Sequence, residues 1–197
     1  MPIEPALDPA RTAVLSMDMQ AGIVSIYAGG EEGFPQRAAE ILRRCRDLRM
    51  MVIHIQVGFR PGLPEVSPRN ALFAAIRNSE RHQRLFQGES GKIHPALGPE
   101  EKDIVISKHR ISAFTGTDLE MILRAHDIET LVMFGIATSG VVLSTLLDAV
   151  DADYRCVVVK DCCADQEADV HTVLVEKFFL RRGTVVTAEE LLKYLGG

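Results

Sequence analysis

The sequence predicts an α/β protein in which a six-stranded parallel sheet is covered by helices on both faces. Six short apolar segments alternate with stretches whose apolar residues recur at helical spacing, a pattern typical of parallel strands joined by helices. The chain has 197 residues and is 47% hydrophobic, which suits one sizeable core. No repeat, linker or low-complexity stretch divides it, so we expect a single domain over residues 1–197.

The first half of the chain is expected to contain two strands, one long helix and a long connection. The strands are expected at 12–18 and 51–57, and the helix at 35–49 has its apolar residues at helical spacing. Residues 58–102 are polar and rich in proline and glycine, with one short helix expected at 71–78. A connection this long in a compact domain usually has a function, such as a lid or an oligomer contact.

The second half continues the alternation of strands and helices. A helix at 117–127 is expected to begin with Thr117 as its N-cap and Glu120 three residues later. The other elements are strands at 103–108, 130–135, 155–161 and 183–187, and helices at 139–151, 166–181 and 188–195.

Composition and charge exclude several classes of partner. The formal net charge is −5 and no basic stripe is present, which argues against nucleic-acid binding. No apolar run approaches the length of a membrane span. The first residues lack an apolar targeting core, so we expect a cytoplasmic protein that is not bound to a membrane. Its four cysteines are too few for a disulfide scaffold and are expected to be reduced.

Two charged residues follow strands at the edge of the sheet where ligands are expected. In open parallel sheets, ligands bind outside the carboxyl ends of the strands. Asp18 ends the first predicted strand, with Gln20 just beyond it, and Lys108 ends the third. Such a carboxylate can act as a general acid or base while the ammonium group holds it in position. The structural alternatives are a turn-forming aspartate and a solvated lysine.

Other polar residues near this edge are candidates for substrate binding. His54 is expected to line the pocket from the second strand. Arg110 alternates with Lys108 on one side of the chain, and its guanidinium suits a substrate carboxylate; a subunit salt bridge is the alternative. The sequence has no zinc-ligand spacing, dinucleotide-binding glycine pattern or P-loop, so no metal and no cofactor is expected.

Three segments resemble the motif regions of the isochorismatase-like hydrolases, also called the cysteine hydrolase superfamily. These are "LSMDMQ", "ISKHRISAFTGTDLEMILRA" and "GIATSGVVLSTLLDAV", in matching order and spacing. The resemblance implies a Rossmann-like, three-layer α/β/α fold. Asp18 and Lys108 match the catalytic Asp and Lys of the amidase members. The position of their nucleophilic cysteine, six residues after Gly135, is occupied by Val141.

Because valine cannot act as a nucleophile, the covalent amidase route through position 141 is excluded. Ser139 and Ser144 are near in sequence but are not expected to replace the cysteine. The isochorismatase branch also lacks the cysteine and retains the Asp and Lys. In that branch the Asp protonates a vinyl ether and water attacks the resulting cation, although a His usually stands where Ser139 lies here. We therefore expect hydrolysis of a small planar or carboxylate-bearing molecule through water attack assisted by Asp18 and Lys108.

The resemblance has further implications for the site and the assembly. It implies a non-proline cis peptide between Ile136 and Ala137, with backbone N–H groups directed at the substrate. Phe114 matches a position near the pocket, where it either stacks on a flat substrate or closes the core. The family usually forms dimers or tetramers, so a homo-oligomer is expected.

Two alternatives remain open at the level of sequence. Cys162 and Cys163 follow the fifth strand; a displaced nucleophile is one interpretation, and inert packing, as for Cys45 and Cys156, is the favoured one. The loss of the cysteine at Val141 also permits a different class of function. The chain would then be a non-catalytic small-molecule-binding or assembly protein that retained the fold.

Overall fold

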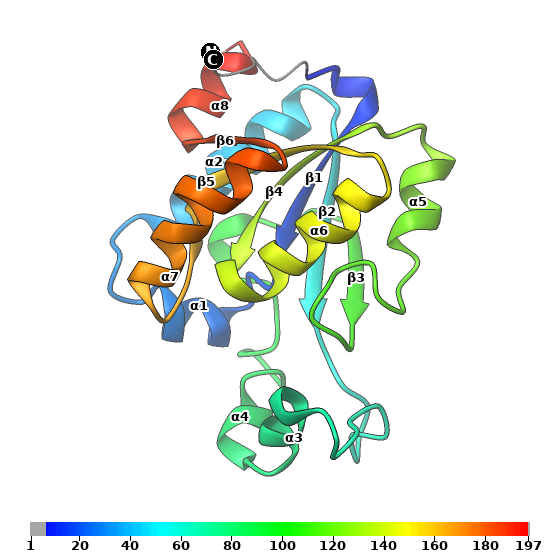
Figure 1. The fold of residues 1–197 in the computed structure, drawn as a ribbon, viewed down its shortest axis with the longest axis vertical. Coiled ribbons are helices and arrows are strands. Elements are labelled where there is room, and N and C mark those ends of the chain that lie inside the picture. Colours follow the sequence, from blue (N-terminus) through cyan, green and yellow to red (C-terminus); the bar gives the residue numbers. More distant parts are fainter. Residues whose placement is uncertain (1–6, 197) are drawn as a thin grey trace.

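The computed structural model describes residues 7–196 and shows a three-layer α/β fold (Figure 1). Its central sheet has six strands in the order β3-β2-β1-β4-β5-β6, and all neighbours pair in parallel. The predicted fold class is therefore confirmed. The strands are β1 (Thr12–Met17), β2 (Met51–Val57), β3 (Ile104–Lys108), β4 (Thr130–Ile136), β5 (Arg155–Ala164) and β6 (Thr184–Val186).

The order of the strands creates a switch point between β1 and β4. From β1 the chain proceeds outward through β2 to β3, then returns to the other side of β1 and proceeds through β4, β5 and β6. Every residue of β1 and of β4 is buried, as expected for the two central strands of a covered parallel sheet. A crevice outside the carboxyl ends of such strands is the usual place for a ligand.

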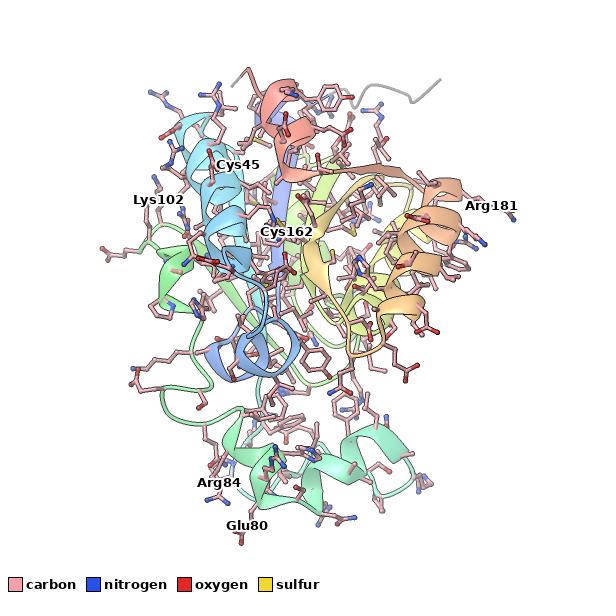
Figure 2. The ribbon with its side chains drawn as sticks, turned by 90° about the vertical axis from the view of Figure 1, so that its left-hand side faces the viewer. Cys45, Glu80, Arg84, Lys102, Cys162 and Arg181 are labelled. Atoms are coloured by element: carbon pink, nitrogen blue, oxygen red, sulfur yellow. The ribbon has the colours of Figure 1, made fainter. Side chains whose placement is uncertain are left out.

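Helices cover both faces of the sheet. Figure 2 shows α2 (Phe34–Asp47) and α7 (Ala168–Val173) on opposite sides of the strands. Helix α8 (Ala188–Tyr194) packs beside α2, and α6 (Leu143–Asp151) packs against β5. One continuous apolar cluster extends through these layers and includes Cys45 and Cys156, as expected.

Helix α5 (Leu119–Ala125) begins differently from the prediction. Its N-cap is Asp118, which makes no side-chain capping bond. The Thr117 hydroxyl accepts a hydrogen bond from the Leu119 N–H at 3.3 Å and donates one to the Ala113 carbonyl at 2.6 Å. The predicted N-cap at Thr117 is therefore wrong, because this hydroxyl closes the preceding turn.

The helices predicted at 139–151 and 166–181 are less regular than their sequence pattern indicates. A wide π-type turn, Thr138–Val142, precedes α6, and Gly140 within it lies outside helical conformation. A second wide turn, Leu174–Phe178, and a 3-10 turn, Phe179–Arg181, follow α7. Two further 3-10 turns occur at Pro9–Arg11 and Pro95–Leu97.

The long connection 58–102, here called the α3–α4 segment, projects beyond the carboxyl ends of the strands (Figure 1). It contains α3 (Ala71–Arg77), as predicted, and also α4 (Glu80–Arg84), which was not predicted. Asn70 caps α3 by accepting from Phe73 N–H, and Ser79 caps α4 by accepting from His82 N–H. Helix α1 (Ala21–Tyr27) was also not predicted.

No helix among residues 7–196 is long and apolar enough to cross a membrane.

Candidate active site

A cavity of about 440 Å³ lies between the carboxyl ends of the strands and the α3–α4 segment. This volume falls within the range of about 300–1,000 Å³ that is usual for small-molecule sites. The strands and their following turns contribute Asp18, Val57, Lys108, Arg110, Ile111, Ile136, Ala137, Ser139, Gly140 and Val141. The remaining walls come from α1 and the α3–α4 segment: Ile23, Tyr27, Leu72, Phe73, Ala75, Ile76, His82, Leu85 and Phe86.

Asp18 and Lys108 form a buried ion pair at this cavity. Lys108 Nζ lies 2.8 Å from Asp18 Oδ2, and the two side chains are 3% and 9% exposed, respectively. Among the described residues no group donates a hydrogen bond to Asp18 Oδ1, the second carboxylate oxygen. Burial raises the pKa of Asp18, and the Lys108 charge and hydrogen bond oppose that rise. The site therefore presents a carboxyl group with one oxygen held by Lys108 and a second, buried oxygen that has no protein donor.

The backbone at the ends of β1 and β4 explains how Asp18 reaches the cavity. Asp18 has a positive φ of 54°, which turns the chain out of the strand directly after Met17. On the neighbouring strand, Gly135 has a φ of 148°, and a Cβ atom there would lie 2.0 Å from the Met17 carbonyl oxygen. Only glycine permits this close approach of the two strand ends.

The turn after β4 is fixed from outside the cavity. The Ile136–Ala137 peptide bond is cis. Asp165 Oδ2 accepts a hydrogen bond from the Ser139 N–H at 2.7 Å, and the Thr138 hydroxyl lies 2.8 Å from His171 Nδ1. The turn is therefore held by Asp165, which directly follows β5, and by His171 of α7.

Comparison with known proteins identifies the family, because residues 12–190 match the isochorismatase domain. This chain belongs to the isochorismatase family. Its family relatives include hydrolases named for amide substrates. Maleamate amidohydrolase of Pseudomonas putida is 26% identical over 94% of this chain and 87% of its own length. Ureidoacrylate amidohydrolase RutB of Rhizobium rhizogenes is 32% identical over 93% and 83%, respectively.

A solved structure of an isochorismatase family protein from Burkholderia thailandensis superposes with a TM-score of 0.82. It is 30% identical in sequence, and the match covers 98% of this chain and 99% of that one. The family, the fold and the hydrolase class therefore agree with the resemblance seen in the sequence.

Several residues predicted for this isochorismatase-family site lie together around the cavity. Ile136, Ala137 and Val141 join Asp18, Lys108 and Arg110 in its lining. The Arg110 guanidinium donates to the carbonyls of His109 at 2.6 Å and Glu65 at 3.1 Å, and lies 5.8 Å from the centre of the Phe73 ring. These contacts hold Arg110 at the boundary between the strand ends and the α3–α4 segment.

Gln20 does not line the cavity, which corrects its predicted role in substrate binding. Its Nε2 donates to the carbonyls of Val57 at 3.1 Å and Gly91 at 2.7 Å, and its Oε1 accepts from the Val57 N–H at 2.9 Å. The side-chain amide is therefore occupied by backbone groups, and it fastens the end of the α3–α4 segment to β2.

His54 is also absent from the cavity lining, contrary to the expectation that it lines the pocket. It lies within β2, three residues before Val57, and its Nε2 is 3.4 Å from Asp103 Oδ2. Asp103 is in turn held by Arg46, whose Nη2 lies 2.6 Å from the same oxygen. Burial lowers the pKa of His54, which favours the neutral ring. His54 belongs to a buried polar cluster with Asp103 and Arg46.

Phe114 is partly buried and packs against the core, with its ring centre 6.1 Å from that of Tyr154, and it does not line the cavity. Of the two alternatives for this residue, these contacts favour closure of the core.

No cysteine lines the cavity among the described residues. Cys162 and Cys163 are buried elsewhere, and Figure 2 shows Cys162 inside the protein between α2 and the sheet. Burial raises the pKa of both thiols, that of Cys163 to about 12. The geometry therefore favours inert packing of these two cysteines.

No sequence pattern pointed to Tyr27 or to the apolar residues of the α3–α4 segment as part of the lining. Burial raises the pKa of Tyr27, and the carboxylates of Asp165 and Asp18 add to the effect. The tyrosine hydroxyl is thus a neutral polar group at the cavity. Within residues 7–196 no group of three or more His, Cys, Asp or Glu side chains is arranged to hold a metal ion.

Proposed function

We propose that this isochorismatase-family member hydrolyses a small molecule in the cavity, with water and not a side chain as the nucleophile. The observation that carries the proposal is the buried Asp18–Lys108 pair, with Asp18 Oδ1 free of protein donors beside the cavity. Val141 stands where the amidase members have their nucleophile, and it offers no lone pair.

Asp18 has the environment of a general acid. Its raised pKa favours the protonated carboxyl group, which can give its proton to a substrate. Lys108 holds Oδ2 at 2.8 Å and stabilises the carboxylate that remains after the transfer. Lys108 can therefore hold Asp18 in the same position before and after the proton is transferred.

A vinyl ether is the substrate class that uses this arrangement most directly. Proton transfer from Asp18 to the terminal carbon of the C=C bond leaves an oxocarbenium ion, and water adds to it. The adduct then releases an alcohol and a carbonyl compound, and the proton from the water returns to Asp18. Bonds and charges balance without a covalent enzyme intermediate.

Amides are the competing substrate class, because two relatives are named amidohydrolases. Water would then attack the carbonyl directly, with Asp18 Oδ1 accepting its proton. A raised pKa makes ionised Asp18 a better proton acceptor. It also increases the fraction of Asp18 that is protonated and therefore unable to accept a proton. We therefore place amides second.

A carboxylate on the substrate fits the charge of the cavity. Ionised Asp18 neutralises Lys108, and Arg110 then adds a positive charge to the lining; with Asp18 protonated, the Lys108 charge adds to that of Arg110. The two backbone hydrogen bonds of Arg110 leave other N–H groups of the guanidinium free to bind an anion.

A non-catalytic binding protein is the second candidate, and Val141 is the observation that favours it. An assembly role without a ligand is less consistent with the structure, since the cavity beside Val141 retains about 440 Å³.

The test is a hydrolase panel of vinyl ethers including isochorismate, amides including nicotinamide, and simple esters. Wild type and Asp18→Asn are assayed side by side. Turnover of a vinyl ether that is lost in Asp18→Asn supports the proposal. Amide turnover that is blocked by thiol alkylation contradicts it. No turnover of any compound, together with retained ligand binding, favours the binding protein.

A further inference from the structure

The cavity has a polar side and an apolar side that come from different parts of the chain. Asp18, Lys108 and Arg110 lie at the strand ends. The α3–α4 segment faces them with five large apolar or aromatic side chains, beside the small Ala75 and one polar ring, His82. The five large side chains are Leu72, Phe73, Ile76, Leu85 and Phe86, here called the apolar roof.

The apolar roof is anchored to the strand ends. Phe59, just after β2, makes edge-to-face contacts with Phe73 and Phe86, at ring-centre distances of 5.9 and 5.6 Å. At the other end of the segment, Gln20 and Ile93 form an antiparallel backbone bridge. The roof therefore presents a fixed surface to the cavity.

The outer face of the same segment is polar. Figure 2 shows Glu80 and Arg84 of α4 directed away from the body of the protein. Leu72, by contrast, lines the cavity and is still 55% exposed. A large apolar side chain exposed inside a cavity gains free energy when an apolar ligand covers it.

We propose that the apolar roof determines specificity, and that it selects a monocarboxylate whose remaining body is aliphatic or aromatic. The carboxylate lies toward Arg110 and the apolar body lies against Leu72 and Ile76. The proposal rests on the proposed function, because it identifies the substrate class of the same cavity. It disfavours substrates that carry charged groups at both ends, so isochorismate, a dicarboxylate, is not expected to be the best vinyl ether of the hydrolase panel.

The test measures binding of compounds that cannot be hydrolysed, namely butanoate, hexanoate, octanoate and adipate, by titration calorimetry on the full chain. Each buried methylene is expected to tighten binding by about fourfold, so hexanoate binds roughly fifteenfold more tightly than butanoate. Adipate has the length of hexanoate but places a second carboxylate against the apolar roof, and it is expected to bind at least tenfold more weakly than hexanoate.

Two variants of the apolar roof, Leu72→Ser and Ile76→Ser, connect the effect to these side chains. Each is expected to weaken hexanoate binding by about fivefold to tenfold while adipate binding changes little. The matched control is Leu180→Ser. Leu180 is 56% exposed, much like Leu72, but lies outside the cavity. It is expected to leave hexanoate binding unchanged.

Equal binding across the series, equal binding of adipate and hexanoate, or no binding of any compound would overturn the inference. An equal loss in Leu180→Ser would overturn it too. The proposed function fails separately, when no compound of the hydrolase panel is turned over. Length-dependent binding without turnover would support the inference about specificity and contradict the proposed hydrolase function. Turnover without length-dependent binding would support the hydrolase function and contradict the inference about specificity.

Discussion

Lys108 Nζ contacts Asp18 Oδ2 at 2.8 Å across the end of β2, the strand that separates β3 from β1. Ninety positions separate the two residues in sequence (108 − 18), so the pair exists only once the parallel sheet has formed. Both groups are almost completely removed from solvent, and neither charge has a second ionic partner among the described residues. The Lys108 charge therefore opposes the effect of burial on the Asp18 carboxyl group.

Replacement of Lys108 by methionine is expected to destabilise the fold. The substitution keeps the length of the side chain but leaves Asp18 without a cation, and breaking a buried pair in this way costs about 3–5 kcal/mol. The free energy of unfolding in urea at pH 7 measures the loss. The control is Arg124→Met, which removes an exposed pair with Glu120 and is expected to cost about 0.5 kcal/mol or less. Equal losses in the two variants would show that the Lys108 pair adds no stability.

The rate of hydrolysis is expected to fall as pH rises through the pKa of Asp18, because a general acid must carry its proton. Burial raises that pKa above the ordinary value of 3.8, so the falling limb lies above the ordinary range of an aspartate. Removal of the Lys108 charge raises the pKa further and moves the limb of the residual rate in Lys108→Met to higher pH. The pH profile of kcat on the best vinyl ether measures both effects. A limb that moves to lower pH in the variant would refute this role.

A second buried pair is expected to make the protein sensitive to acid. Burial acts to raise the pKa of Asp103, but hydrogen bonds from Arg46 and the Glu100 backbone, with the Arg46 charge, outweigh it and lower the pKa. A lowered pKa contributes stability above the ordinary value of 3.8, and that stability is lost as pH falls through the folded-state pKa.

Asp103→Asn is therefore expected to cost about 3–5 kcal/mol at pH 7, and the difference from wild type should shrink as pH falls below 3.8. Urea unfolding of both proteins over a series of pH values measures this difference. Glu120→Gln on the exposed face of α5 serves as the control and should show almost no difference at any pH. A difference that stays constant with pH would rule out the ionic origin.

The rule that ligands bind at the carboxyl ends of parallel strands was sufficient to select Asp18 and Lys108 from the sequence. The ends of the strands can be located from apolar runs in short stretches of sequence, and the rule requires only the positions of those ends. Gln20 satisfied the same rule and His54 was chosen by the alternation of side chains along a strand, but neither pattern says what a side chain bonds to. The partners of Gln20 are the backbone groups of Val57 and Gly91, which no local pattern reveals.

The apolar roof illustrates a different limit of sequence patterns. Helix α3 was predicted because "ALFAAIR" has apolar residues at helical spacing. Helix α4 has the sequence "ERHQR", which has no apolar periodicity, and its start is fixed by the Ser79 cap. That the apolar face of this segment closes a cavity depends on the contacts of Phe59, which are tertiary.

The four cysteines are expected not to react in the folded protein. All four are free and buried, and burial raises the pKa of the thiols of Cys45, Cys156 and Cys163 to about 12. A thiol without access to solvent or to its thiolate form reacts slowly. Titration with a chromogenic disulfide reagent at pH 7 should detect no thiol in buffer and four in concentrated urea. Rapid reaction of one thiol in buffer, accompanied by loss of hydrolysis, would instead support the interpretation that Cys162 or Cys163 acts as a displaced nucleophile.

Gly135→Ala is expected to disrupt the junction on which the site depends. The new methyl group would lie 2.0 Å from the Met17 carbonyl oxygen, and the φ of 148° is accessible essentially to glycine alone. Since both obstacles are backbone features of the two central strands, neither can relax by rotation of a side chain. We expect a loss of about 3 kcal/mol or more in the free energy of unfolding.

Gly30→Ala is the matched control, because a Cβ atom at Gly30 would have no neighbour within 4 Å and its φ is not in the left-handed region. That variant should unfold within about 0.5 kcal/mol of wild type. If Gly135→Ala were as stable as Gly30→Ala, β1 and β4 would be able to separate without cost, and the position of Asp18 would have to be fixed by Lys108 alone.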